Sequence, residues 1–345
     1  MKWKVKEIAE LKGYTVEWAE PDNFYLSRRN ILYYSNDLVP PFKKIATIET
    51  PAWKQFVSNV RLAQRLLRFM VTNVIPLGNG NLFVTFDKTA GIVDEQGNYM
   101  PLKGLMRPCR VLRSGCAVDE NSNIFFGEYL ANNERGKILI YKYERGCDTL
   151  EVIYTFPADS IKHIHGLYFD EATKSIFCLT GDDESECRIL QTFDEFQTIN
   201  IVGEGDETWR AVSILFSEDS LVYGMDAEYR SNHIYKLNRE TSERQSLGEV
   251  NGTVFYSKQL GGDLFFTTTA ENAPNQKENV AALWNIGVTG KVEEIIRFKK
   301  DIWHTSLFQF GTIHFPFVNK CENELYFHLV GVKGDNRTFK VQSLA

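Results

Sequence analysis

The stretch LVYGMD (221–226) decides the fold, because versions of it repeat along the chain. In each version a compact apolar run leads into an acid or a Gly/Thr/Ser cluster, and a second short strand follows after a turn. The clearest other copies are IFFGE (124–128), IFCLTGD (176–182) and LFFTTTAE (264–271). They recur about every 45 residues, which is the repeat length of a four-stranded propeller blade. The repeat therefore predicts an all-β fold of the β-propeller type.

Seven blades account for the chain when apolar runs bounded by Gly, Asn and Asp turns are taken as strands. Blade one is expected to contain strands at 15–19, 24–27, 31–35 and 43–48. The other blades are expected at 72–104, 109–157, 163–203, 210–250, 253–299 and from 312 to the end. The last blade shows only three strands, so residues 2–8 are expected to supply its fourth and to remove a free sheet edge. Six blades are the alternative, because blade one is the least regular.

One helical insertion interrupts the link between blades one and two. Apolar residues recur with a period of about 3.6 between residues 52 and 70, and Pro51 precedes them, as suits the start of a helix. Arg61, Arg65 and Arg68 fall on one stripe of this helix, which indicates a solvated face or, alternatively, a face turned to an anion.

Composition limits the function and the compartment. The 345 residues, 43% hydrophobic and 13% aromatic, suit a single propeller domain over residues 1–345. A net charge of −6 argues against a nucleic-acid partner or an anionic membrane surface. The N-terminal residues lack the pattern of a signal peptide, and no apolar run is long enough to insert into a membrane, so we expect a cytoplasmic protein. The six cysteines are dispersed without metal-type or redox spacing, and the oligomeric state stays open.

The unusual polar residues concentrate at one end of the predicted blades. Links from a fourth strand to the next first strand emerge at the same end as links from a second to a third strand. These links contain His163, His165, His304, Arg107, Arg110, Arg210, Trp209, Trp303, Glu128, Tyr129, Asp182, Asp226, Glu228, Tyr229 and Glu271. The turns at the opposite end have ordinary hairpin composition without His, Arg or aromatic residues. This asymmetry predicts a functional site at the first end.

The two closely spaced histidines are candidates for the base of such a site. His163 and His165 are two apart, so in an extended strand their side chains point the same way. Gly166 indicates a close backbone approach beside them and favours His165 as a general base or a metal ligand. With His304 they could hold a divalent cation, but the spacing matches no known metal signature, and we expect no metal and no cofactor. A purely structural role for each histidine is the alternative.

Arginines, acids and aromatics complete the predicted site. Arg210 either forms an ion pair with Asp226 or Asp182 or binds a carboxylate or phosphate of a substrate, a role that Arg110 is expected to share. Paired carboxylates about 5 to 10 Å apart divide acid and base work in glycosidases, which makes Asp182, Asp226 and Glu128 catalytic candidates. The remaining substrate-binding candidates are Glu228 and Glu271 and the aromatic residues Trp209, Tyr129 and Tyr229. The aromatic rings would offer flat faces to sugars, and ordinary packing or turn capping is the alternative for each of these side chains.

Several stretches resemble a family of uncharacterised, glycosyl-hydrolase-like and sialidase-like β-propellers found with bacterial surface-polysaccharide genes. They are HIHGLYFD (163–170), LTGDD (179–183), WRAVSILF (209–216), YGMDAE (223–228), NGTVFYS (251–257), ALWNIG (282–287) and FQFGTIHFPF (308–317). Degenerate versions of the Asp box of these propellers occur at LYYSND (32–37) and QTFDEFQT (191–198), and in sialidases such boxes are structural turns. The N-terminal arginine motif of sialidases is absent, so the resemblance does not extend to sialic-acid hydrolysis.

Two functions of different classes are consistent with these features. The first is a carbohydrate-active enzyme that binds an anionic oligo- or polysaccharide and cleaves it as a glycoside hydrolase or a polysaccharide lyase. The second is a non-catalytic propeller that binds a glycan or a protein as a scaffold in polysaccharide biosynthesis. The sequence contains no glycine-rich phosphate loop, no GxSxG elbow and no HExxH helix, which argues against nucleotide cofactors and serine-hydrolase chemistry.

Overall fold

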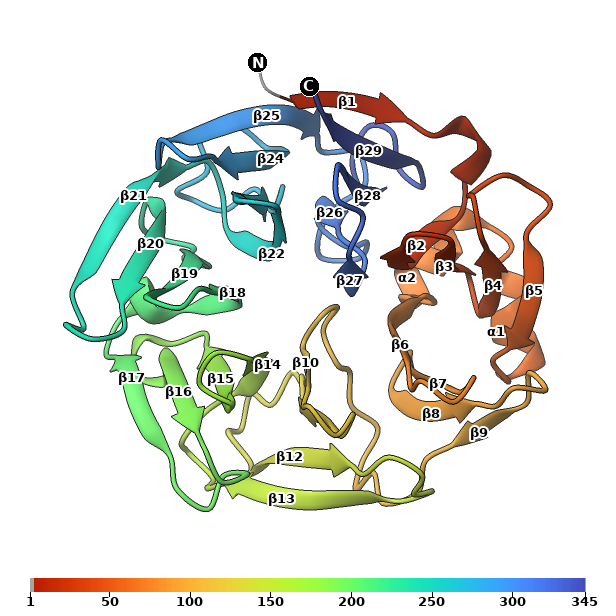
Figure 1. Cartoon of the computed structure of the whole chain (residues 1–345), viewed down its shortest axis with the longest axis horizontal. Helices are drawn as coiled ribbons and strands as arrows, with labels where there is room; N and C mark the ends of the chain where they lie inside the picture. Colours follow the sequence, from red (N-terminus) through yellow and green to blue (C-terminus); the bar gives the residue numbers. More distant parts are fainter. Residues whose placement is uncertain (1–2, 345) are drawn as a thin grey trace. The chain divides into compact units, whose positions relative to one another are not determined.

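The strands of the protein form seven sheets in the computed structural model, which describes residues 3–344. Six sheets have four strands and one has five, and strands that follow one another in the sequence are mostly neighbours in the same sheet. Such consecutive four-stranded sheets are the blades of a propeller. The chain is therefore an all-β, seven-bladed β-propeller (Figure 1), as the repeat predicts, and the six-bladed alternative is wrong.

Two compact units make up the described chain, and one of them consists of residues 102–257. This unit contains three complete sheets. They are β10 (Cys116–Val118), β11 (Ile124–Gly127), β12 (Ile138–Tyr143) and β13 (Leu150–Phe156); β14 (His163–Asp170), β15 (Ser175–Gly181), β16 (Arg188–Thr192) and β17 (Asn200–Glu204); and β18 (Ala211–Phe216), β19 (Ser220–Met225), β20 (Asn232–Asn238) and β21 (Arg244–Val250). Short 3-10 turns at Glu184–Glu186 and Glu207–Trp209 lie between these strands.

The other unit combines the described residues up to Pro101 with those from Lys258 onward. The sheet of β22 (Val254–Leu260), β23 (Asp263–Thr268), β24 (Val280–Ile286) and β25 (Val292–Lys299) begins at the boundary between the units. The first two sheets are β2 (Thr15–Glu20), β3 (Asn23–Arg28), β4 (Ile31–Ser35) and β5 (Lys43–Thr47), joined by β27 (Val318–Asn319), and β6 (Val71–Pro76), β7 (Leu82–Phe86), β8 (Thr89–Val93) and β9 (Tyr99–Pro101). The expectation of a single domain over residues 1–345 stays a prediction.

The N-terminal strand completes the last sheet, as predicted. This sheet contains β26 (Thr312–His314), β28 (Glu324–Val330), β29 (Thr338–Ser343) and β1 (Trp3–Glu7). In the antiparallel register of β1 and β29, Trp3 lies opposite Ser343 and Val5 lies opposite Val341. The pairing satisfies the backbone edge that β29 would otherwise expose.

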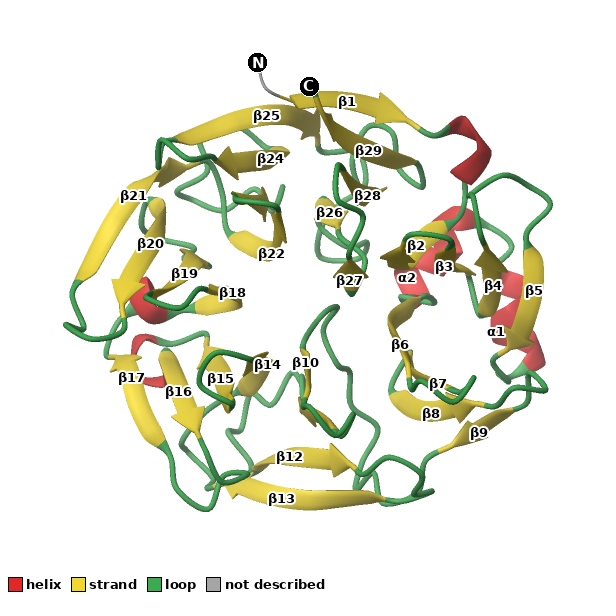
Figure 2. Cartoon of the chain, in the orientation of Figure 1, coloured by secondary structure: helices red, strands yellow, loops and turns green. Residues whose placement is uncertain are grey.

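The helical insertion between β5 and β6 is confirmed, but it consists of two short helices, drawn in red in Figure 2. They are α1 (Ala52–Val57) and α2 (Arg61–Leu67). The Ser58 hydroxyl and the Asn59 amide donate hydrogen bonds to backbone carbonyls of the preceding turn, and Val60 is extended. Such local side-chain bonds compete with a continuous helix and explain the break. No helix of residues 3–344 is both long and apolar enough to cross a bilayer.

Two of the three arginines of the predicted stripe pair with acids of the protein, whereas Arg68, which follows the end of α2, is exposed to solvent. Arg65 is only 2% exposed and forms an ion pair with Asp301, and Arg61 donates two hydrogen bonds to the carboxylate of Asp335. Arg61 and Arg65 therefore attach α2 to two loops of the same unit.

The three blades of residues 102–257 pack against each other in sequence order. Strand β14 contacts β10 and β11 on one side and β18 on the other. Figure 1 shows β10 and β18 next to β14. A buried cluster that includes Phe125, Ile140, Ile164 and Leu190 fills the space between the first two of these blades.

The second predicted Asp box lies in the turn between β16 and β17, where Asp194 accepts hydrogen bonds from the backbone and hydroxyl of Thr198.

Candidate functional site

Both histidines of the predicted site lie at the beginning of β14, and their side chains share one side of the strand. The register of β14 against β15 shifts between Ile164 and Gly166, which leaves His165 as the extra residue of a β-bulge. Bulges re-aim side chains next to functional sites. Here the two imidazole rings lie with their centroids 5.1 Å apart. Both side chains are almost completely buried.

Backbone carbonyl groups fix the tautomer of each ring. Nδ1 of His163 lies 2.8 Å from the carbonyl oxygen of Leu130, and Nδ1 of His165 lies 2.9 Å from that of Ala211. Because a carbonyl oxygen only accepts hydrogen bonds, Nδ1 carries the hydrogen in both rings. In the neutral form of each histidine, the lone pair is therefore on Nε2.

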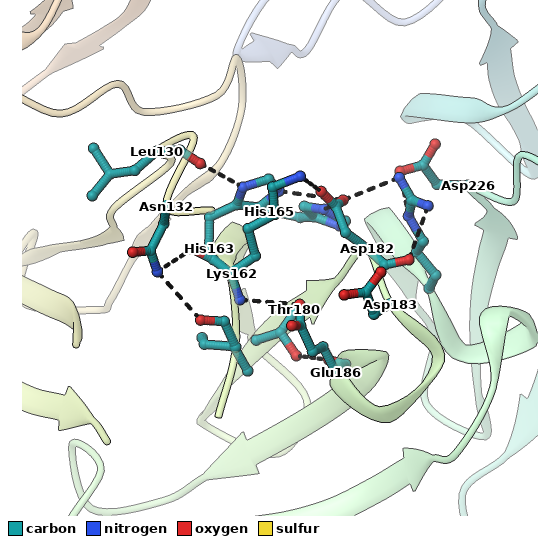
Figure 3. Close-up of polar contacts among 12 residues, drawn as sticks. Leu130, Asn132, Lys162, His163, His165, Thr180, Asp182, Asp183, Glu186 and Asp226 are labelled. Atoms are coloured by element: carbon teal, nitrogen blue, oxygen red, sulfur yellow. Dashed lines mark hydrogen bonds and ion pairs between the residues drawn. The ribbon is translucent and has the colours of Figure 1, made fainter. Parts of the chain in front are cut away.

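Asp182 is the residue on which the neighbouring side chains converge (Figure 3). Its Oδ1 lies 3.5 Å from Nε2 of His163, 3.6 Å from Nε2 of His165 and 3.1 Å from Nη2 of Arg210. Its Oδ2 accepts a hydrogen bond from the ammonium group of Lys162. Sequence reasoning thus correctly predicts that residues from the ends of different strands meet here.

The electrostatics of the cluster favour an ionised Asp182. Burial raises the pKa of its carboxyl, but His163 and His165, which carry a positive charge and a hydrogen on Nε2 when protonated, outweigh this effect and hold the pKa well below its usual range. Burial lowers the pKa of His165, against the opposite influence of Asp182. Asp182 also has a φ of 144°, a conformation that non-glycine residues rarely adopt. Backbone strain of this kind concentrates at functional sites.

Arg210 forms ion pairs with acids that follow two different strands. Its Nε lies 3.1 Å from Oδ2 of Asp226, its Nη2 lies 3.5 Å from Oε1 of Glu228, and its Nη1 donates to the backbone carbonyl of Asp182. Burial lowers the pKa of Arg210, but Asp226, Asp182 and Glu228 together raise it above its ordinary value. Two roles were predicted for Arg210, an ion pair with an internal acid and the binding of a substrate anion. The structure contains the ion pairs, and through them Arg210 orients Asp182.

Glu128 binds protein groups rather than facing the cluster. Its carboxylate is fully buried, accepts a hydrogen bond of 3.0 Å from Nε of Arg107 and a second bond from Nη2, and also accepts from the hydroxyl of Tyr141 and the backbone N–H of Leu139. The residue therefore stabilises the loop before β10, and its catalytic role stays a prediction.

The predicted aromatic residues differ in their surroundings. Tyr129 is half-buried, and its ring centroid lies 4.2 Å from that of His163. Tyr229 is 74% exposed. Trp209 packs against the ring of Tyr223, and the guanidinium group of Arg244 lies 4.0 Å from its ring centroid. Tyr129 is thus the predicted aromatic residue that lies directly beside the histidines.

The remaining predicted residues lie in different surroundings. Arg110 is half-buried, and its carbonyl accepts a hydrogen bond from the backbone of Tyr129. Glu271 and His304 belong to the other unit, where Glu271 accepts a hydrogen bond from Thr269 and the exposed His304 lies next to Ser306. The three-histidine cation site is therefore not assembled within residues 102–257.

The sequence did not reveal the residues whose hydrogen bonds hold the cluster in place. The side-chain amide of Asn132 donates to the carbonyl of Lys162, and the carboxylate of Glu186 accepts from the backbone N–H of the same lysine. Thr180 in turn donates to the carbonyl of Glu186. The position of Lys162 directly before His163 was a usable signal for the lysine, whereas Asn132 and Glu186 show no pattern that separates them from turn residues.

Comparison with known proteins supports the fold and no particular family. No family model matches the chain, and no curated protein matches its sequence. Solved structures that are similar to it include a streptogramin B lyase (TM-score 0.60, 11% identity, 99% of this chain and 98% of that chain covered). They also include an oligogalacturonate lyase in complex with manganese (TM-score 0.61, 8% identity, 99% of this chain and 96% of that chain covered). A third is the oligogalacturonate lyase of Vibrio parahaemolyticus (TM-score 0.61, 9% identity, 99% of this chain and 97% of that chain covered). At these identities the likeness shows the propeller fold alone.

Proposed function

We propose that the protein binds an anionic carbohydrate at the cluster around Asp182 and cleaves it by β-elimination. The observation that carries this proposal is the pair of Nε2 atoms turned toward one partly exposed carboxylate, with Lys162 and Arg210 adjacent. The cluster offers basic nitrogen atoms for removing a proton and cationic side chains that favour a nearby anion.

β-Elimination requires a sugar whose carboxylate makes the hydrogen on the neighbouring carbon acidic, as in a uronate. Nε2 of His165 accepts the proton from the carbon next to the uronate carboxylate, and the electron pair of that C–H bond forms a carbon–carbon double bond. The glycosidic C–O bond on the next carbon breaks, and the departing oxygen takes up a proton from a water molecule. The half-buried ring of Tyr129 offers a surface on which a sugar ring can pack.

A lyase agrees better with the geometry than a hydrolase. Hydrolysis by two carboxylates needs one protonated acid and one free base. Asp182 and Asp226 both form ion pairs with the buried Arg210, which favours the ionised form of each. Neither residue is therefore suited to serve as the protonated acid.

The experiment is a panel of uronate-containing oligosaccharides, including oligogalacturonates, because oligogalacturonate lyases share this fold. Elimination creates an unsaturated product that absorbs ultraviolet light, and its release is expected for at least one member. Replacing His165 with Gln should lower the rate by about 10²–10⁴-fold, as expected for loss of a general base. His233→Ala is the matched control, because His233 bonds to Ser246 outside the cluster. Absence of turnover across the whole panel would contradict the proposal.

A further inference from the structure

We propose that His163, His165 and Asp182 form a binding site for one divalent transition-metal ion of the Zn²⁺ class. The ligand atoms are Nε2 of both histidines and Oδ1 of the aspartate. The inference is independent of the carbohydrate proposal, because it follows from the positions of these atoms alone.

When both rings are neutral, three acceptors converge at this point without a hydrogen between them. The carbonyls of Leu130 and Ala211 hold the hydrogen on Nδ1 of each ring, so that both Nε2 lone pairs are directed at the carboxylate. Nε2 of His163 is buried and has no hydrogen-bond partner among the described residues, although the side chain is only 3% exposed. An unpartnered polar atom of this kind is costly, and a bound cation would satisfy it.

The distances suit an ion rather than a direct hydrogen bond. N–H···O bonds measure about 2.7–3.2 Å, whereas Oδ1 of Asp182 lies 3.5 Å and 3.6 Å from the two Nε2 atoms. Two ligand atoms, each about 2.1 Å from a tetrahedral ion, lie about 3.4 Å apart. The three potential ligand atoms all lie within 4.8 Å of one another. Small side-chain movements would therefore bring all three into coordination.

The carbonyl groups also supply the outer support that metal sites require. A ligating histidine usually donates its second ring N–H to a carbonyl or carboxylate, which fixes the ring orientation. Leu130 and Ala211 already accept these bonds, and Lys162 and Arg210 orient the carboxylate of Asp182. The ring positions are thus set by neighbouring blades of the same unit.

The local charge permits a dication. Lys162 and Arg210 face three carboxylates, those of Asp182, Asp226 and Glu228, which leaves one formal negative charge in excess. Three protein ligands leave the fourth position of a tetrahedral ion for water or a substrate oxygen, as in catalytic zinc sites. If the carbohydrate proposal also holds, such an ion would lower the pKa of a bound water to about 7, and the resulting hydroxide, in place of a histidine, would accept the proton.

Titration of chelator-treated protein with Zn²⁺ by calorimetry, and with Co²⁺ by visible absorption, tests the site. One equivalent is expected to bind, and Zn²⁺ should raise the melting temperature. Asp182→Asn, which keeps the shape of the side chain, should weaken binding at least about 100-fold, in line with the effect of changes around metal ligands. Asp170→Asn is the matched control, since Asp170 is a buried carboxylate at the other end of β14, away from His163 and His165, and pairs with Arg239.

His163→Gln gives a second test that leaves the carboxylate in place, and circular dichroism verifies that each variant is folded. Weakened binding in both cluster variants and unchanged binding in the control supports the proposal. Absence of saturable binding in the wild type overturns it and leaves a water molecule or a proton between the acceptors. Binding that neither cluster substitution weakens overturns it as well. Neither result depends on whether a carbohydrate is cleaved.

Discussion

Removal of the Arg210 guanidinium group is the most informative perturbation of the cluster. The side chains of Arg210 and Asp226 are 8% and 5% exposed and approach within 3.1 Å. At that separation the attraction is about 5 kcal/mol for an effective dielectric constant of about 20, before the cost of desolvation. Removing one partner of a buried pair typically costs about 3–5 kcal/mol, because the other charge stays buried. Arg210→Met, which retains an apolar chain of similar length, should lower the free energy of unfolding by that amount.

Urea unfolding followed by tryptophan fluorescence measures this loss. The double variant Arg210→Met, Asp226→Asn should be less destabilised than the sum of the single variants by roughly 1–3 kcal/mol, because it no longer buries an unpaired carboxylate at position 226. Additive effects, or a loss below about 1 kcal/mol in Arg210→Met, would refute the reasoning that Arg210 is chiefly an internal counter-ion.

Three further predictions concern other parts of the structure. Burial raises the pKa of Asp335 but Arg61 outweighs this and lowers it, so the pair stabilises above the ordinary value of 3.8 and the stabilisation is lost as pH falls through the lower folded pKa. Asp335→Asn should therefore lower the free energy of unfolding, measured with urea, by about 1–3 kcal/mol at pH 7 and by progressively less in acid. An equal loss of unfolding free energy at pH 7 and in acid would contradict this. In Gly127→Ala the new Cβ would lie 2.5 Å from Cδ1 of Ile164, so a loss of about 1–3 kcal/mol is expected in thermal melts, against almost none for Gly262→Ala, which meets nothing within 4 Å. Deletion of residues 3–7 should expose the edge of β29 and cause concentration-dependent association in light scattering, whereas a monodisperse product would argue against a protective role of β1.

Hydrophobic pattern and turn composition were sufficient to predict most of the fold. Strand alternation at 15–19, 24–27 and 31–35 matches β2, β3 and β4, and the missing fourth strand of the last blade correctly indicated β1. The break between α1 and α2 was missed because it depends on side-chain hydrogen bonds of Ser58 and Asn59. Periodicity does not register such bonds.

The meeting of His163, His165, Asp182 and Arg210 was predicted from topology, because the ends of these strands lie on one side of their blades. The detailed roles of these four residues were not predicted. Packing between blades determines the bulge at His165, the carbonyl groups that accept from the two rings, and the burial of Glu128. A single sequence does not show which residues of different blades lie close together.

The central claim is that His163, His165 and Asp182 bind one metal ion. Its most direct test is anomalous diffraction, at the zinc absorption edge, from crystals grown with Zn²⁺. The claim predicts one strong peak about 2.0–2.2 Å from Nε2 of His163, Nε2 of His165 and Oδ1 of Asp182. A peak at another place, or ordinary water density between these three atoms in zinc-saturated crystals, would contradict it.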